Sequence, residues 1–207
     1  CCPSVNEAAQ RHRLAETRMR VYPPGPSQSE QHWFAEMASP YGWLMTAENL
    51  FEQCVAQHRR KGRAYLTLKD RHGRQLRWDV VDRSMFLLGG FALENAIKAF
   101  LVYENPKYVA QGRLAHQLRS HRLLKLKRAS KTIPMPMRSE PIFQVFEGAI
   151  ETWSRYPSGL TAPQTDHQRW FTPELWQSYC DLMRRYRLRL RQHLEKGWNG
   201  PHGSGGK

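Results

Sequence analysis

The amino-acid sequence predicts an all-α protein, an up-and-down bundle of four to five helices with a small β-hairpin inserted in it. Three observations lead to this prediction. Four segments carry apolar residues at helical spacing, helix-start and helix-stop residues bound them, and one short stretch alternates instead. There is no internal repeat, and 207 residues suit one domain with terminal arms.

Two helices are predicted in the first half of the chain. The first covers residues 43–60, where apolar side chains recur every three or four positions. The second covers residues 82–103, and its part from 85 to 103 carries only two charged side chains, Glu94 and Lys98. A helix that is apolar on every side is buried, so we expect this one in the core.

Two further helices complete the bundle. Residues 140–153 begin with Pro141 close to the start, a position that favours proline. Residues 172–196 begin with Thr172 and Pro173, an N-cap residue followed by a proline at the first helical position. This last helix is rich in arginine, and its apolar residues share one face.

Two connecting segments are less regular. Residues 64–80 form two partly alternating runs around His72 and Gly73, which predicts a β-hairpin. Residues 114–128 carry several leucines in a basic setting, and we expect one or two short helices there. The bundle thus has short additions between its main helices.

The sequence divides into three parts. Residues 1–30 form an N-terminal arm with a proline-rich linker, residues 31–196 the helical bundle, and residues 197–207 a flexible, glycine-rich tail. The four cysteines form no CxxC motif, so we expect neither disulfides nor a metal site. Cys54 and Cys180 are interpreted as buried thiols in helices.

The chain is strongly basic, with 32 Lys and Arg against 18 Asp and Glu and a formal charge of +14. Arginine outnumbers lysine 23 to 9, and its planar guanidinium suits phosphates and bases. Residues 105–139 contain nine basic residues and no acidic one. This balance favours a polyanionic partner, nucleic acid first and an anionic membrane surface second. A basic face that docks an acidic protein is the alternative.

No membrane-spanning segment is expected, because the longest stretch without a charge is the 11 residues from 37 to 47, and a span needs about 20 apolar residues. No signal peptide is visible, and the cysteines are interpreted as free thiols, which predicts a cytoplasmic protein. Phosphate-binding loops, HExxH and GxSxG motifs do not occur, so we expect no cofactor.

Three motifs follow one another in the second half of the chain. They read FLLGGFALENAIKA at residues 86–99, SHRLLKL at residues 120–126 and WSRYP at residues 153–157. In this order they resemble the HEPN superfamily of helical bundles, whose members often carry a GxAxENxxKA-like helix, a GHxLxxL segment and a WxxRYP turn. Ser120 stands where that family usually has glycine, and residues 64–80 look like an insertion.

The resemblance implies a helical protein that binds RNA or a nucleotide, as a homodimer, in a toxin–antitoxin or defence system. An antitoxin or a nucleotidyltransferase-like protein would be its partner. Many HEPN members are metal-independent ribonucleases with an arginine four to six residues before a histidine, as Arg187 and Arg189 stand before His193. Leu188 departs from the polar residue that commonly follows the arginine. The alternative is a catalytically inactive HEPN module that binds a protein partner through a basic face.

The candidate site residues fall into two groups. Those considered for proton transfer or for stabilising the phosphate during cleavage are His121, His193, Arg155, Arg187 and Arg189. Those considered for binding a nucleic acid or nucleotide are Arg119, Arg122, Lys125, Lys127, Lys98, Asn95 and Glu94.

Structural roles compete with these assignments. Glu94 and Lys98 stand four residues apart on an apolar helix, where an ion pair that fixes packing explains both charges. His121 serves either as a base or as a helix cap. His193 falls in the apolar sector of its helix, which favours a core or interface residue. Arg155 either contacts phosphate or bridges to Glu94.

Overall fold

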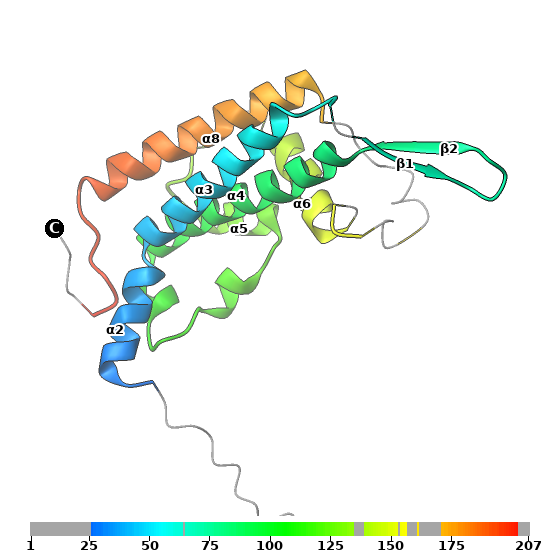
Figure 1. The fold of residues 1–207 in the computed structure, drawn as a ribbon. Helices are drawn as coiled ribbons and strands as arrows, with labels where there is room; N and C mark the ends of the chain where they lie inside the picture. Colours follow the sequence, from blue (N-terminus) through cyan, green and yellow to red (C-terminus); the bar gives the residue numbers. More distant parts are fainter. Residues whose placement is uncertain are drawn as a thin grey trace, which may run out of the picture.

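The computed structural model shows helices packed side by side into a bundle from which a β-hairpin extends (Figure 1). It describes residues 26–63, 65–134, 139–152, 154–156, 161 and 171–202. The predicted all-α bundle with a small hairpin is therefore confirmed. Most of the predicted arm, together with Trp153 and Pro157 of the WSRYP motif, lies outside the described residues.

Two helices open the described chain. α2 (Gln28–Met37) begins with a capping box, in which the Ser27 hydroxyl accepts from the Glu30 amide and the Glu30 carboxylate accepts from the Ser27 amide. α3 (Pro40–His58) follows, with Ser39 as its N-cap and a proline in its first turn. α3 confirms the first predicted helix. α2 was not predicted, although the Ser-x-x-Glu spacing of its capping box marks its start.

The segment between α3 and the central helix forms the predicted hairpin. β1 (Tyr65–Lys69) and β2 (Gln75–Asp79) pair antiparallel and extend away from the helices (Figure 1). Asp70 holds the connecting loop, because its carboxylate accepts from both the amide and the guanidinium of Arg74. Gly73 has a φ of 77°, a left-handed conformation that glycine adopts without strain.

α4 (Val80–Glu104) is the central helix, and α3, α5, α6 and α8 all contact it. α4 has two adjacent glycines, and neighbouring helices come close there because glycine has no side chain. A Cβ atom on Gly90 would lie 2.3 Å from Cγ2 of Ile150, and the Tyr179 hydroxyl donates to the carbonyl of Gly89 at 3.1 Å. The buried second helix expected from the sequence is confirmed.

α4 is also the one helix, in the part of the chain described, that is long and apolar enough to cross a membrane. In the bundle, 78% of its most apolar window is buried inside the protein. A helix at the centre of a bundle needs the same composition, so this feature is weak evidence for a membrane span.

The segment that directly follows α4 is basic and forms only short helices. Two short 3-10 helices, η1 (Pro106–Val109) and η2 (His116–Arg119), precede α5 (Leu123–Ala129). α6 (Glu140–Glu151) and α8 (Pro173–Leu194) then pack against α4. The short helices expected within residues 114–128 and both late helices of the bundle are confirmed.

Part of the predicted tail lies against the helices. The Trp198 indole donates to the carbonyl of Val102 at 3.2 Å, and the His202 ring is 6.3 Å from the ring of His32 on α2. Residues 203–207 lie outside the described residues. The described end of the chain therefore closes one end of the bundle.

Candidate functional site

A buried ion pair lies on α4. Lys98 Nζ is 2.6 Å from Glu94 Oε1, and each side chain is 5% exposed. The ammonium also lies over the Trp43 ring of α3, 5.4 Å from its centroid. A charge in such a setting needs a partner inside the protein, because little water reaches it. This geometry supports the structural role for Lys98, which does not lie on the surface.

The other oxygen of Glu94 contacts the candidate histidine. His121 Nδ1 is 2.9 Å from Glu94 Oε2, and the imidazole meets the ring of Phe91 edge-on at 6.3 Å. The His121 side chain is 55% exposed, in contrast to its buried partner. When Glu94 accepts the proton of Nδ1, a neutral ring has its lone pair on Nε2. The carboxylate thus orients an imidazole that is open to solvent.

The segment around His121 has no acidic residue of its own, and carboxylates of neighbouring helices hold it. Glu94 and Glu104 both belong to α4. Glu104 accepts hydrogen bonds from residues 130–132 at 2.6–3.0 Å. Glu147 of α6 accepts from a backbone amide in the first turn of α5 at 2.9 Å, where a negative charge favours the helix.

Two of these carboxylates, Glu104 and Glu147, were missed by sequence reasoning. Burial disfavours the ionised form of Glu104, but the hydrogen bonds from Ser130, Thr132 and the backbone outweigh it and leave its pKa lowered. No local pattern marks Glu104 or Glu147. The only signal was indirect. Because the basic segment contains no acidic residue, the carboxylates that pair with it are expected on the neighbouring helices.

Three of the predicted phosphate-binding cations lie exposed near His121. Arg119 donates to a nearby backbone carbonyl at 3.2 and 3.3 Å. Arg122 is 71% exposed and only loosely paired, 3.9 Å from Glu151 of α6. Lys125 projects from α5 and is exposed as well. The imidazole of His121 therefore lies in a positively charged stretch of surface.

Two other binding candidates are buried or half-buried. Lys127 is 4% exposed, and its ammonium lies over the Phe143 ring, 4.6 Å from the centroid. Burial lowers the pKa of Lys127. The Asn95 amide donates to the carbonyl of Phe91 one turn earlier in α4, at 2.7 Å. Lys127 is therefore not placed to contact a molecule on the surface, and the half-buried Asn95 uses its amide nitrogen within α4.

A small cavity of about 90 Å³ opens beside the basic segment. This is well below the 300–1,000 Å³ or so of typical small-molecule sites, so a whole nucleotide does not fit inside it. Binding is expected along the surface instead. The residues that line the cavity are Leu101, Tyr108, His116, Gln117, Ser120, Lys125, Leu126 and Ala129.

The second candidate histidine is part of the core. His193 is 8% exposed, and its ring packs against Tyr103 at 4.8 Å and Phe100 at 6.2 Å. Burial, followed by the charges of Arg189 and Lys196, lowers its pKa. The structure gives its buried Nε2 atom no hydrogen-bond partner among the described residues. This agrees with the structural role that its place on the helix suggested.

The two histidines do not come together within one chain. His121 contacts Glu94 on α4, whereas His193 contacts Tyr103 on the same helix. Nine residues separate these positions, which is about 13 Å along the helix and about 180° around it. The two imidazoles therefore lie on different sides of α4.

The three candidate arginines are also dispersed. Arg187 is 3.8 Å from Glu48 of α3, and Arg189 is exposed on α8. Arg155 is exposed beyond the end of α6 and lies over the ring of Tyr156. Of the three, Arg155 is nearest in sequence to Glu151, whose carboxylate lies 3.9 Å from the Arg122 guanidinium. No contact joins Arg155 to Glu94 in the described part of the chain, where Glu94 binds Lys98 and His121.

Within the described residues, no group of three or more His, Cys, Asp or Glu side chains is placed to hold a metal ion. The arrangement that remains is chemically simple, an exposed imidazole held by a buried carboxylate and surrounded by cations. Comparison of the chain with known protein families, with curated proteins and with solved structures finds no match.

Proposed function

We propose that this protein binds single-stranded RNA along the surface of residues 113–131. The observation that carries the proposal is the exposed imidazole of His121, held by Glu94 within a segment that has no acidic residue. Exposed arginine and lysine side chains beside it suit the phosphate backbone. The carboxylates that hold the segment are turned toward it from α4 and α6, so they fix its shape.

The salt dependence of RNA binding tests this proposal. In the triple variant Arg119→Gln, Arg122→Gln, Lys125→Gln, each lost phosphate contact should reduce the slope of log affinity against log salt by about 0.7. The total loss is then about 2 for three contacts. Fluorescence anisotropy with a labelled oligonucleotide provides the slope.

A matched control removes the same charge elsewhere. The variant Arg59→Gln, Arg60→Gln, Arg185→Gln neutralises three exposed arginines, two just after the end of α3 and one on α8. It should leave the slope close to that of the unchanged protein. Equal losses of slope in both triple variants would mean that net charge, and not this surface, governs binding.

Cleavage of the bound RNA is a second candidate function, favoured by the contact between Glu94 and His121. In such a reaction His121 Nε2 accepts the proton of a 2′-hydroxyl, whose oxygen then attacks the adjacent phosphorus. The bond to the 5′-oxygen breaks, which leaves a 2′,3′-cyclic phosphate, and the departing 5′-oxygen takes a proton from water or a second acid to become a hydroxyl. Arg122 would stabilise the charge on the phosphate oxygens.

A ribonuclease assay in EDTA tests cleavage. His121→Ala should slow it by about 10²- to 10⁴-fold, the usual contribution of a general base. His193→Phe should leave the rate unchanged, and DNA should resist because it lacks the 2′-hydroxyl. Cleavage that persists in His121→Ala would assign the activity to another site or a contaminant.

The resemblance to HEPN proteins supports a homodimer, in which a second subunit would supply the acid or another arginine. It likewise supports a cytoplasmic toxin or defence protein with an antitoxin or nucleotidyltransferase-like partner. A subunit exchange experiment tests the shared site: mixing His121→Ala with Arg155→Gln protein should restore part of the cleavage only if two subunits combine their groups.

A further inference from the structure

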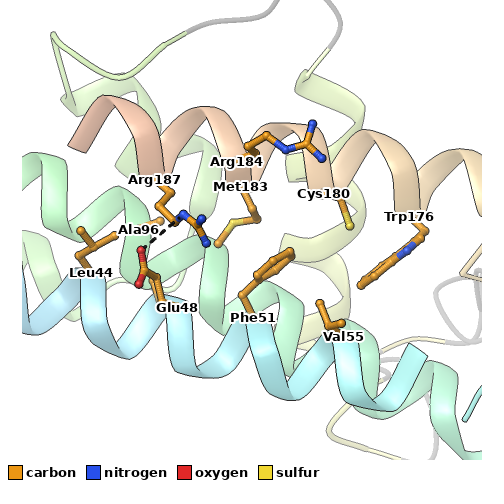
Figure 2. Close-up of a pocket in the computed structure, with 11 residues that line it drawn as sticks. Leu44, Glu48, Phe51, Val55, Ala96, Trp176, Cys180, Met183, Arg184 and Arg187 are labelled. Atoms are coloured by element: carbon orange, nitrogen blue, oxygen red, sulfur yellow. Dashed lines mark ion pairs between the residues drawn. The ribbon is translucent and has the colours of Figure 1, made fainter. Parts of the chain in front are cut away.

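A second hollow lies between α3 and α8, away from the basic segment. It has a volume of about 290 Å³, close to the lower limit of small-molecule sites. α3 and α8 form its two walls, and Ala96 of α4 forms part of its floor (Figure 2). None of the residues near His121 lines it, so it is independent of the proposed RNA surface.

The walls of this hollow are almost entirely apolar. Phe51 and Val55 of α3 face Trp176 and Met183 of α8 across the space (Figure 2). Cys180 adds a half-buried thiol, and burial raises its pKa to about 11, so that it is neutral at physiological pH. Such walls favour a hydrocarbon or aromatic body over a polar one.

One end of the hollow carries a cation, Arg187. Arg184 also lines the hollow, but its guanidinium is paired with the Asp181 carboxylate at 2.9 Å. Glu48 lies at the same end, but it is neutralised by Arg191, whose guanidinium contacts both carboxylate oxygens at 3.1 and 3.2 Å. The contact of Arg187 with Glu48 is longer, at 3.8 Å (Figure 2). Arg187 can therefore turn to an anion while Glu48 keeps a counter-charge.

The size of the hollow decides between kinds of occupant. An α-helix with its side chains is about 10–12 Å wide, and a stable protein interface buries about 800 Å² on each partner. A hollow of about 290 Å³ is too small for either and suits one small molecule. We propose that it binds a small amphiphilic anion, with the apolar body between α3 and α8 and a carboxylate or similar head group on Arg187.

Calorimetric titration with decanoate tests this proposal, below the concentration at which decanoate forms micelles. We expect one molecule to bind per chain, and decyltrimethylammonium, which has the same tail and the opposite charge, to bind far more weakly. Arg187→Gln should weaken decanoate binding about tenfold, the loss expected for a charge-assisted contact. Arg185→Gln, which removes an exposed arginine of α8 that does not line the hollow, should leave it unchanged.

A variant that fills the space separates this site from general attraction to a basic protein. Val55→Trp places a large side chain at a half-buried position in the wall, and it should abolish decanoate binding. Alkylation of Cys180, followed by peptide mass spectrometry, gives a second measurement. Decanoate should slow this alkylation in the unchanged protein and not in Val55→Trp. Equal binding of the cationic amphiphile, or undiminished binding by Val55→Trp, would overturn the proposal.

Discussion

Two histidines on opposite sides of α4 show how differently this protein uses the same side chain. His121 is 55% exposed, and its ring is oriented by the buried carboxylate of Glu94 at 2.9 Å. His193 is 8% exposed and lies between aromatic rings, with one nitrogen that has no partner in the described part of the chain. A histidine that contacts a carboxylate through one ring nitrogen and is exposed to solvent at the other can exchange a proton. A histidine enclosed by aromatic rings contributes to the packing of the core.

The neighbouring residues explain why the two environments differ. The environment of His121 contains charges from α4 and from the segment before α5, and it includes the buried pair of Glu94 and Lys98. The ring of His193 packs against Phe100 and Tyr103, and burial lowers its pKa more than the charges of Arg189 and Lys196 do. The same helix therefore carries a polar network on one side and an aromatic core on the other.

Removing Glu94 should destabilise the protein more than any other change proposed for this region. In Glu94→Ala, Lys98 remains buried without its counter-charge, a loss that typically costs about 3–5 kcal/mol. Chemical denaturation with urea measures the free energy of unfolding. The double variant Glu94→Gln, Lys98→Met removes both charges and should recover most of that loss. If the double variant were as unstable as Glu94→Ala, the ion pair would not be the cause.

Acid should destabilise the protein partly through His193. Because burial lowers its pKa in the folded protein, the unfolded chain binds this proton more readily. The stabilising contribution is complete above the ordinary histidine pKa of about 6.5 and is lost as the pH falls toward the folded value. The slope is at most about 1.4 kcal/mol per pH unit. His58, whose pKa burial also lowers, acts in the same direction.

His193→Phe isolates the contribution of His193. It removes a buried nitrogen without a partner while keeping an aromatic ring, so stability at pH 7.5 should change little. Between about pH 6.5 and pH 5 the variant should lose less stability than the unchanged protein. Urea unfolding across this range measures both effects. An unaltered pH dependence would show that His193 does not titrate differently in the folded and unfolded states.

The smallest expected effect distinguishes two lysines of α5 that stand two residues apart. Lys125 is exposed, whereas Lys127 is buried against Phe143. Lys125→Gln should reduce the salt slope of RNA binding by about 0.7, and Lys127→Gln should leave the slope unchanged while reducing stability. Anisotropy titrations at several salt concentrations give the slopes. A larger effect of Lys127→Gln on the slope would place the RNA on the other side of α5.

Much of the fold could be predicted from local patterns in the sequence. The apolar run of α4, the Thr-Pro start of α8 and the alternation around Gly73 are each encoded within a few residues. α2 escaped prediction because it is only 10 residues long and buries only Ala35, so that no apolar face marks it, and only Ser27 and Glu30 signal its start.

The candidate site could be predicted only in part, because its contacts join distant residues. His121 and Glu94 were each selected, but no local pattern pairs residues that lie 27 positions apart. Lys125 and Lys127 look alike in sequence, and the packing of α5 on Phe143 decides which of them reaches solvent. The roles of Glu104 and Glu147 depend in the same way on tertiary packing.

The most direct test of the account follows the two imidazoles as RNA is added. Histidine ring signals in two-dimensional NMR spectra can be assigned with His121→Gln and His193→Phe, and the titration uses a short single-stranded RNA at low salt. We predict that the His121 signals shift in proportion to the bound fraction, whereas those of His193 stay in place. Unmoved His121 signals in saturated protein, or shifts of His193 as large as those of His121, would contradict the assignment of the RNA surface to the side of α4 that carries Glu94.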